Sequence, residues 1–239
     1  MKSRNLSRSF PTLLAGLVLF FISSCNPGPA TVTDIDGNVY KSVKIGAQVW
    51  MASNLKTTRF NDGTAIPLVP EKSSWSAVST PEYCWYNNEV ANKEVYGALY
   101  NWSTVSTGKL CPSGWHVPTD AEWATLITYL GGDSIASGKL QETGMNHWQS
   151  PNVEGTNISG FAALPGGFRS YYGDFCSIGG CGCWWSSTED GTYYAWGRLV
   201  GYGYNPADRI CYVKQGGWSV RNKGGNNKQS GFSVRCLRD

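Results

Sequence analysis

The sequence predicts an α+β domain in which two helices pack on a small mixed or antiparallel sheet and a loop-rich β half follows. The first observation is that two stretches with the apolar spacing of a helix lie between about residues 95 and 130. The second is that glycine, tyrosine, tryptophan, serine and cysteine crowd together past Gly160, where helical periodicity disappears. Helices followed by strands are typical of an α+β fold. Because no internal linker interrupts residues 32–239, we expect them to form one domain.

The first 24 residues have the pattern of a secretory signal peptide. Lys2, Arg4 and Arg8 precede an apolar run over residues 13–22, and two small serines follow. The run is shorter than the about 20 apolar residues that a transmembrane helix needs. Ile22-Ser23-Ser24-Cys25 resembles the lipobox of bacterial lipoproteins, which implies acyl chains such as palmitate on Cys25. The alternative is an ordinary secreted protein in which Cys25 is incidental.

Residues 25–31 are rich in proline and glycine and are expected to form a short tether between the acylated Cys25 and the domain. The expected partner at this end is therefore the lipid bilayer. The expected location is the cell envelope, at the outer membrane, with the face of attachment undecided. No acidic cluster resembling a surface-export signal follows Cys25.

The charge of the mature chain is balanced. The whole sequence has 20 Lys and Arg against 17 Asp and Glu, and the three basic residues of the signal peptide account for the difference. A neutral chain without a basic run lacks the electrostatic signature of nucleic-acid binding. We therefore expect no nucleic-acid partner.

Residues 32–51 read as β-hairpins. Asp34-Ile35-Asp36-Gly37-Asn38 has turn chemistry, residues 39–45 alternate, and Gly46-Ala47 turns the chain into residues 48–51. Asp-x-Asp-Gly also resembles the start of a calcium loop, but the twelfth position of such a loop needs Glu and here is Ile45. The turn is the favoured interpretation, and no metal or cofactor is expected.

The clearest helix follows Pro118. Thr119 and Glu122 form a predicted capping box, and the apolar residues Trp123, Leu126, Ile127 and Leu130 then lie on one helical face. Gly131-Gly132 ends the run. A second helix is predicted over residues 95–105. Strands are predicted, past Gly160, over residues 161–164, 184–188, 194–200, 209–213 and 232–237.

Six phrases in this order carry a family resemblance. They are Ile45-Gly46-Ala47-Gln48-Val49-Trp50-Met51, Tyr96-Gly97-Ala98-Leu99-Tyr100-Asn101-Trp102, Cys111-Pro112-Ser113-Gly114-Trp115-His116-Val117-Pro118, Leu164-Pro165-Gly166-Gly167-Phe168-Arg169, Trp184-Trp185-Ser186-Ser187-Thr188 and Gly231-Phe232-Ser233-Val234-Arg235-Cys236. The chain thus resembles the Fibrobacter succinogenes major paralogous domain family over nearly all of its mature length.

The resemblance implies a C-type-lectin-like fold, similar to its formylglycine-generating-enzyme branch, and an exported protein. It supplies no activity. Cys111 and Cys236 match cysteines of the family, which suggests a disulfide between them. Formylglycine-generating enzymes bind copper(I) through two cysteines, but Cys176, Cys181 and Cys183 precede the strands that hold that pair, so a copper oxidase is a weak alternative.

No other catalytic constellation is evident. The only histidines are His116 and His147, and a phosphate-binding loop and a His-Glu-x-x-His motif are both missing. The sequence therefore predicts a protein that is not an enzyme.

Tyrosine and tryptophan beside small residues are typical of binding loops, because they offer rigid contact area at low entropic cost. The resemblance adds that relatives have Tyr or Asn at several positions where this chain has Cys or Gly, a pattern typical of retroelement diversification. We therefore expect residues 171–228 to form a variable ligand-binding face for an extracellular protein or glycan. The candidate contact residues are Gly180, Cys181, Cys183, Tyr193, Tyr194, Gly201, Tyr202, Gly203, Tyr204 and Trp218.

Two further expectations concern this half of the chain. Trp184, Trp185 and Trp196 are interpreted as core residues. Side chains two apart on a strand are about 7 Å apart, so Cys181 and Cys183 are expected to bridge to Cys176 or Cys211 and not to each other. The alternative to ligand binding is a structural envelope protein without a specific ligand.

Overall fold

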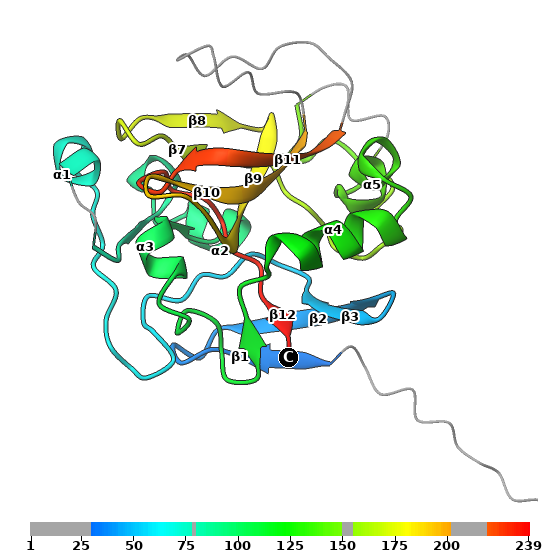
Figure 1. Cartoon of the computed structure of the whole chain (residues 1–239), viewed down its shortest axis with the longest axis horizontal. Helices are drawn as coiled ribbons and strands as arrows, with labels where there is room; N and C mark the ends of the chain where they lie inside the picture. The colour runs from blue at the N-terminus through cyan, green and yellow to red at the C-terminus, as the bar shows by residue number, and fades with distance from the viewer. Residues whose placement is uncertain (1–29, 78–79, 150–154, 202–218) are drawn as a thin grey trace, which may run out of the picture.

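The computed structural model describes residues 30–77, 80–149, 155–201 and 219–239, and these residues combine helices with curled sheets (Figure 1). Two five-stranded sheets account for most of the strands, and the helices lie between and beside them (Figure 1). The α+β class is therefore confirmed. Within the described ranges, no helix has the length and apolar character needed to cross a membrane.

The first sheet brings the two ends of the described domain together. Its order is β1-β2-β3-β12-β6, and every pair in it is antiparallel. The hairpin expected from sequence is confirmed as β2 and β3. The bounds of the five strands are β1 Thr31–Thr33, β2 Val39–Ile45, β3 Gln48–Met51, β12 Leu237–Arg238 and β6 Trp115–His116.

The turn between β1 and β2 is held by Asp34. Its Oδ1 accepts hydrogen bonds from the backbone N–H groups of Asp36 at 3.0 Å and Asn38 at 2.9 Å, and its Oδ2 accepts from the Tyr40 hydroxyl at 2.5 Å. This is the side-chain hydrogen bonding of an Asx turn. Both carboxylate oxygens of Asp34 are thus engaged in hydrogen bonds within the turn and to Tyr40, as the turn interpretation expects.

Helix α4 (Asp120–Tyr129) begins as the sequence predicts. The Thr119 hydroxyl accepts from the Glu122 N–H, and the Glu122 carboxylate accepts from the Thr119 N–H at 2.7 Å, which completes the capping box. Trp123, Leu126 and Ile127 are buried. Helix α5 (Asp133–Leu140) follows after Gly131 and Gly132 and is missed by the sequence analysis.

The helix predicted over residues 95–105 is wrong. The chain forms α2 (Asn92–Tyr96), β5 (Leu99–Tyr100) and α3 (Trp102–Val105) instead, and β5 pairs with β4 (Tyr83–Cys84). Gly97 separates them with φ of 75°, and a Cβ atom there would lie 2.7 Å from the Leu55 carbonyl oxygen. Close packing and strand pairing therefore outweigh the apolar spacing. Sequence analysis also misses the 3-10 helix η1 (Tyr86–Asn88) and α1 (Lys72–Ala77).

The second sheet has the order β11-β10-β9-β7-β8 and is mixed, because β7 runs parallel to β9 whereas the other pairs are antiparallel. A bulge between Ala195 and Gly197 of β10 interrupts its pairing with both neighbours. The bounds are β7 Gly166–Arg169, β8 Phe175–Ile178, β9 Cys181–Asp190, β10 Tyr194–Gly201 and β11 Ser219–Asn227.

The strands predicted past Gly160 are confirmed only in part. The strands expected over residues 184–188 and 194–200 are confirmed as parts of β9 and β10. Residues 161–164 form no strand, since Ala163 makes only an isolated bridge to Gln141. In residues 232–237 only Leu237 belongs to a strand, β12, whereas Phe232 and Ser233 make isolated bridges. The strand expected over residues 209–213 lies outside the described residues.

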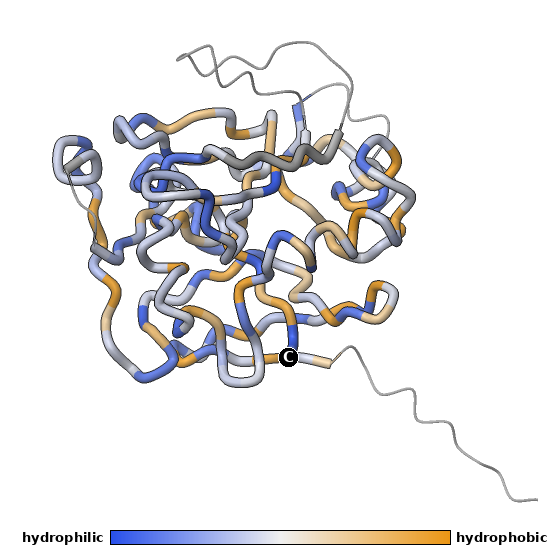
Figure 2. Tube along the Cα trace, viewed as in Figure 1, coloured by the Kyte–Doolittle hydropathy of each residue, from blue (hydrophilic) through white to orange (hydrophobic). Residues whose placement is uncertain are grey.

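Tryptophans dominate the core. Trp123 of α4 packs with Trp50 and Phe161, and Trp184 joins this cluster. Trp185 stacks on Phe232 at 4.3 Å between ring centroids in the neighbouring cluster. Figure 2 shows apolar stretches on the β2–β3 hairpin and on α4 and α5. Trp184 and Trp185 are thus core residues as predicted, whereas Trp196 is partly exposed.

Candidate ligand-binding face

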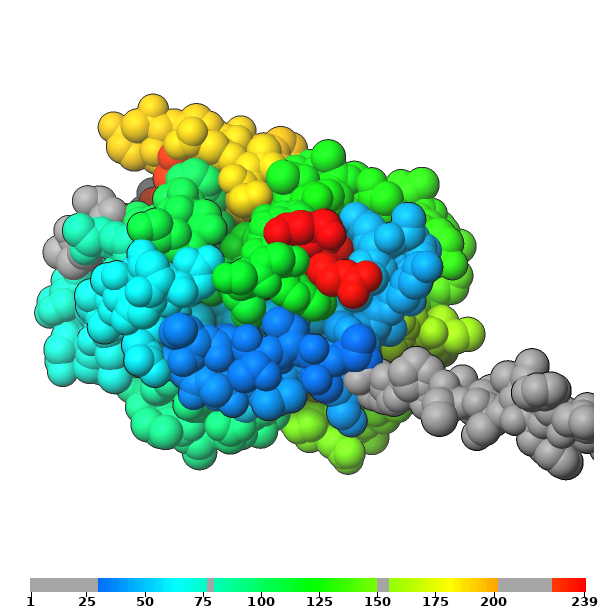
Figure 3. All heavy atoms as spheres, turned by 90° about the horizontal axis from the view of Figure 1, so that it is seen from below, coloured from blue at the N-terminus to red at the C-terminus, as the bar shows by residue number. Residues whose placement is uncertain are grey.

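Exposed tyrosines stand on the turn between β9 and β10. Tyr193 is 72% exposed and Tyr194 is 45% exposed. Figure 3 shows this hairpin, in gold, standing out from the body of the molecule. Both residues are candidates predicted from sequence, and the structure leaves their rings accessible to a ligand.

Lys228 fixes this turn. Its ammonium forms an ion pair with Glu189 and donates to the carbonyl oxygens of Gly191 at 2.8 Å and Thr192 at 2.9 Å. The same ammonium lies 4.7 Å from the centre of the Trp102 ring, which adds a cation–π contact. The turn that carries the tyrosines is therefore tied to the body at its tip.

A second pair of tyrosines lies on the turn between β7 and β8. The Tyr171 and Tyr172 ring centroids are 3.9 Å apart, and Tyr172 is 46% exposed. Because β7 runs parallel to β9, their following turns leave the second sheet in the same direction (Figure 1). We name residues 170–174 and 191–194 the tyrosine turns. Tyr172 was not a sequence candidate, although the Tyr-Tyr-Gly phrase after a strand was its signal.

Arg169 supports the β7–β8 turn from below. Its side chain is fully buried and donates to the carbonyl oxygens of Gly173 at 3.1 Å, Val69 at 2.7 Å and Pro70 at 2.8 Å. The guanidinium lies over the rings of Trp75 at 4.5 Å and Phe175 at 4.8 Å. Sequence analysis gave Arg169 no role, because two of its acceptors, Val69 and Pro70, are 100 and 99 residues away in the sequence.

Four other candidates are corrected by the structure. Gly180, Cys181, Cys183 and Gly201 are buried, and the two cysteine side chains face the core. They lie at the far end of the β9–β10 hairpin from Tyr193. A ten-residue strand spans about 30 Å, so these residues and Tyr193 do not form one face.

The burial of Gly201 has a steric reason. Its φ is 130°, and a Cβ atom there would lie 2.4 Å from the Gly180 carbonyl oxygen. A side chain at this position would collide with the backbone of the neighbouring strand. Gly201 is therefore accounted for by close packing.

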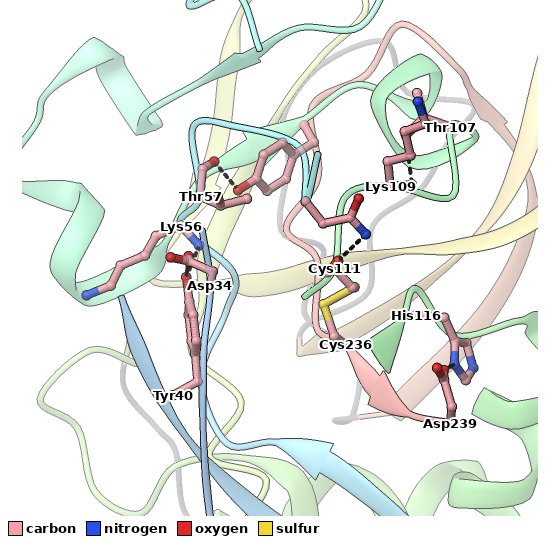
Figure 4. Close-up of a disulfide and its surroundings, with 12 residues drawn as sticks. Asp34, Tyr40, Lys56, Thr57, Thr107, Lys109, Cys111, His116, Cys236 and Asp239 are labelled. Atoms are coloured by element: carbon pink, nitrogen blue, oxygen red, sulfur yellow. Dashed lines mark hydrogen bonds and ion pairs between the residues drawn. A yellow bond between two sulfur atoms is a disulfide. The ribbon is translucent and has the colours of Figure 1, made fainter. Parts of the chain in front are cut away.

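The cysteines follow the sequence analysis only in part. Cys111 and Cys236 form a disulfide with 6.0 Å between their Cα atoms, as the family resemblance suggested (Figure 4). Cys181 and Cys183 are thiols whose sulfur atoms lie 3.8 Å apart, so the expected bridges from them are wrong.

Cys84 is a buried thiol, and burial raises its pKa to about 12. Within the described ranges, no three His, Cys, Asp or Glu side chains are grouped as a metal site would require.

The remaining candidates are Tyr202, Gly203, Tyr204 and Trp218. They lie outside the described residues, as do Cys25, the tether and Cys211.

Comparison with known proteins gives one match. A family model described as the Fibrobacter succinogenes major domain matches residues 43–238. Neither the curated proteins nor the solved structures contain a match to the chain.

Proposed function

The chain belongs to the Fibrobacter succinogenes major domain family, and from this premise we propose that it is an envelope lipoprotein, attached through acylated Cys25, whose C-type-lectin-like domain binds an extracellular protein or glycan. The membrane expected to hold it is the outer membrane. Its proposed role is recognition and not catalysis. The contact residues proposed from the described part of the chain are Tyr172, Tyr193 and Tyr194.

One observation carries this proposal. The described chain begins at Ala30, beside β1 at the lower side of the molecule in Figure 1, whereas the second sheet with its tyrosine turns forms the upper part. A tether at Ala30 would thus leave the second sheet, which carries the tyrosine turns, on the side of the domain far from β1. Such separation suits a domain that presents a surface to a ligand.

The chemistry of the tyrosine turns supports binding. A tyrosine offers a broad ring and a polar hydroxyl while only two side-chain torsions are ordered on contact. Lys228 and Arg169 already hold the two turns, so little backbone entropy would be lost when a ligand binds. Glycans and proteins are both compatible with such a surface.

We also propose that sequence variation among related genes, if a retroelement produces it, acts at the exposed turns. Gly180, Cys181, Cys183 and Gly201 are interior positions, where replacement would disturb packing before it altered a ligand contact. A neighbouring reverse-transcriptase gene with a template repeat is the expected genomic finding. If that gene and repeat are absent, the proposed diversification by a retroelement is wrong, but the proposed ligand binding is unaffected.

Binding can be tested with a triple variant, Tyr172→Ala, Tyr193→Ala and Tyr194→Ala. We expect its binding to glycan arrays and to envelope or extracellular protein panels to fall at least about tenfold, because exposed aromatic anchors often carry more than 1 kcal/mol each. Tyr129→Ala is the matched control, since Tyr129 is 64% exposed on α4 and its ring lies beside Gly46, in the turn of the β2–β3 hairpin. Equal losses in both variants, or none in the triple variant with an unchanged melting temperature, would contradict the proposal.

The anchor needs a separate test. Mass spectrometry of the mature protein is expected to find diacylglycerol and an amide-linked acyl chain on Cys25, and Cys25→Ala is expected to abolish labelling by a palmitate analogue. A mature protein that begins elsewhere and carries no lipid would overturn the lipoprotein assignment.

A further inference from the structure

We infer that a row of side chains on the first sheet, Lys44, Val49, Arg238 and Trp115, is a docking surface for the anionic phospholipid headgroups of the membrane that holds the anchor. We name these four residues the basic row. The inference rests on the proposed lipid anchor and adds a defined orientation of the domain at the bilayer.

Strand register places the four residues side by side. Lys44 pairs with Val49 across β2 and β3, and Arg238 pairs with Trp115 across β12 and β6. Leu237 pairs with Trp50, so in this antiparallel ladder Arg238 stands next to Val49. Paired residues share one face of a sheet. The row therefore crosses four neighbouring strands on a single face.

The two basic side chains of the row are unpaired. Lys44 and Arg238 are exposed, and neither forms an ion pair with a described residue. Asp239, which follows Arg238, contacts His116 at 2.6 Å (Figure 4). Glu122 of α4 contacts the other ring nitrogen of His116 at 3.0 Å. The predicted mature chain has no net charge, but charges act over about one Debye length. A nearby surface therefore meets the unpaired ends of Lys44 and Arg238, while Asp239 contacts His116.

The other two members of the row suit a membrane interface. Val49 and Trp115 are half-buried, and Trp115 packs on the core with part of its ring accessible. Tryptophan favours the headgroup region, where its apolar ring and polar N–H are both accommodated. Lysine and arginine extend charged ends toward headgroups while their aliphatic stems cover apolar surface. Charge and aromatic surface here occur together.

The tether leaves the domain beside this row. Ser42 donates its N–H and its hydroxyl to the Ala30 carbonyl oxygen, at 2.8 Å and 2.7 Å. Ser42 and Lys44 are two residues apart on β2 and share a face. Figure 3, seen from below, shows the C-terminal residues in red next to β1–β3 in blue on one surface. A bilayer at the end of the short predicted tether, residues 25–31, therefore lies within reach of this surface.

The experiment uses the purified acylated protein in vesicles of brominated phosphatidylcholine, with or without phosphatidylglycerol. Bromine quenches tryptophans that approach the lipid, and the difference between the wild type and Trp115→Phe isolates Trp115. We expect Trp115 to be quenched in the anionic vesicles at low salt and released at high salt. Lys44→Glu with Arg238→Glu is expected to reduce the anionic-lipid-dependent quenching at least about tenfold.

The control is Lys72→Glu with Lys93→Glu, which changes the net charge equally on α1 and α2 and is expected to keep the quenching. Retention on neutral vesicles reports the anchor alone, so failure of the anchor and failure of the row are separate results. The inference is overturned if Trp115 is quenched equally in neutral and anionic vesicles, or if the control pair abolishes quenching as well as the row pair does.

Discussion

At the scale of single residues, the interior contains buried charged side chains that are stabilised in different ways. Arg198 is neutralised by an ion pair with Asp120 at 2.5 Å. Arg169 instead donates to backbone carbonyl groups, and Arg235 donates to the Asn54 side-chain oxygen and to the Phe161 and Ala162 carbonyl groups. Both guanidinium groups lie over aromatic rings. Burial lowers the pKa of Arg235 to about 9, so its guanidinium is still charged at neutral pH. Fixed carbonyl dipoles take the place of water around these cations.

Glu82 is the buried acid whose charge is least supported. It is 1% exposed, and its Oε2 accepts no hydrogen bond from the described residues. Burial raises the pKa of Glu82 from 4.5 to about 7, and the Asn101 hydrogen bond and the charge of Arg169 oppose this rise only in part. The neutral acid is therefore the form that the fold favours.

Stability is accordingly expected to depend on pH through Glu82. Because the folded pKa is the higher one, the contribution of Glu82 is fully present below pH 4.5 and is lost as the pH rises through about 7. The loss is expected to reach about 3 kcal/mol. Denaturant unfolding of wild type and Glu82→Gln across this range measures it, with the exposed Glu89→Gln as control. A Glu82→Gln variant that retained the full pH slope would contradict the assignment.

At the scale of elements, short strands and turns form where the local apolar spacing predicts a helix. Residues 95–105 have helical spacing, yet Leu99 and Tyr100 pair with β4, and the Tyr100 N–H donates to the Phe232 carbonyl at 2.9 Å. These partners are distant in sequence. The α4 capping box lies within four residues, which is why it could be recognised from sequence.

Gly97 is expected to be indispensable for this arrangement. Gly97→Ala would place a Cβ atom 2.7 Å from the Leu55 carbonyl oxygen and 2.9 Å from the Asn54 Cβ atom, at a positive φ. Gly63→Ala is the matched control, since Gly63 also has positive φ but no atom lies within 4 Å of its Cβ position. We expect Gly97→Ala to lower the free energy of unfolding by about 1–3 kcal/mol more than the control does. Equal melting-temperature shifts in Gly97→Ala and Gly63→Ala would show that the positive φ, and not the close contact with Leu55, causes the loss of stability.

At the scale of the whole molecule, the disulfide closes most of the domain. Cys111 and Cys236 are 125 residues apart, and the bridge ties the loop before β6 to the segment that leads into β12. A crosslink over such a long loop restricts the unfolded chain strongly. The ends of this loop both adjoin the first sheet, which also holds the first described strand, β1.

Removing the bridge is therefore expected to cost stability. Cys111→Ala with Cys236→Ala should lower the free energy of unfolding by about 2–5 kcal/mol. Chemical denaturation under oxidising conditions measures the difference. The same comparison in reductant serves as the control, because the two proteins should then differ much less. A double variant as stable as the oxidised wild type would refute the stabilising role.

What could be predicted from sequence depended on short-range chemistry. The β2–β3 hairpin, the capped helix and the two tryptophans at positions 184 and 185 follow from patterns within a few residues. The pairing of Cys111 with Cys236 came from the family resemblance. The expected ligand-binding face was less accurate, because composition does not distinguish a buried Gly201 from an exposed one.

The sequence by itself determined the α+β class, the family and where the strongest local elements begin and end, because turns, caps and apolar periods involve neighbouring residues. Only the tertiary structure decided that Cys181 and Cys183 point into the core, at the opposite end of the β9–β10 hairpin from Tyr193. It also decided that Lys44 and Arg238 share a face with Trp115. The physical reason is register. Pairing between distant strands determines which side chains meet, and a shift of one residue would send each to the other face.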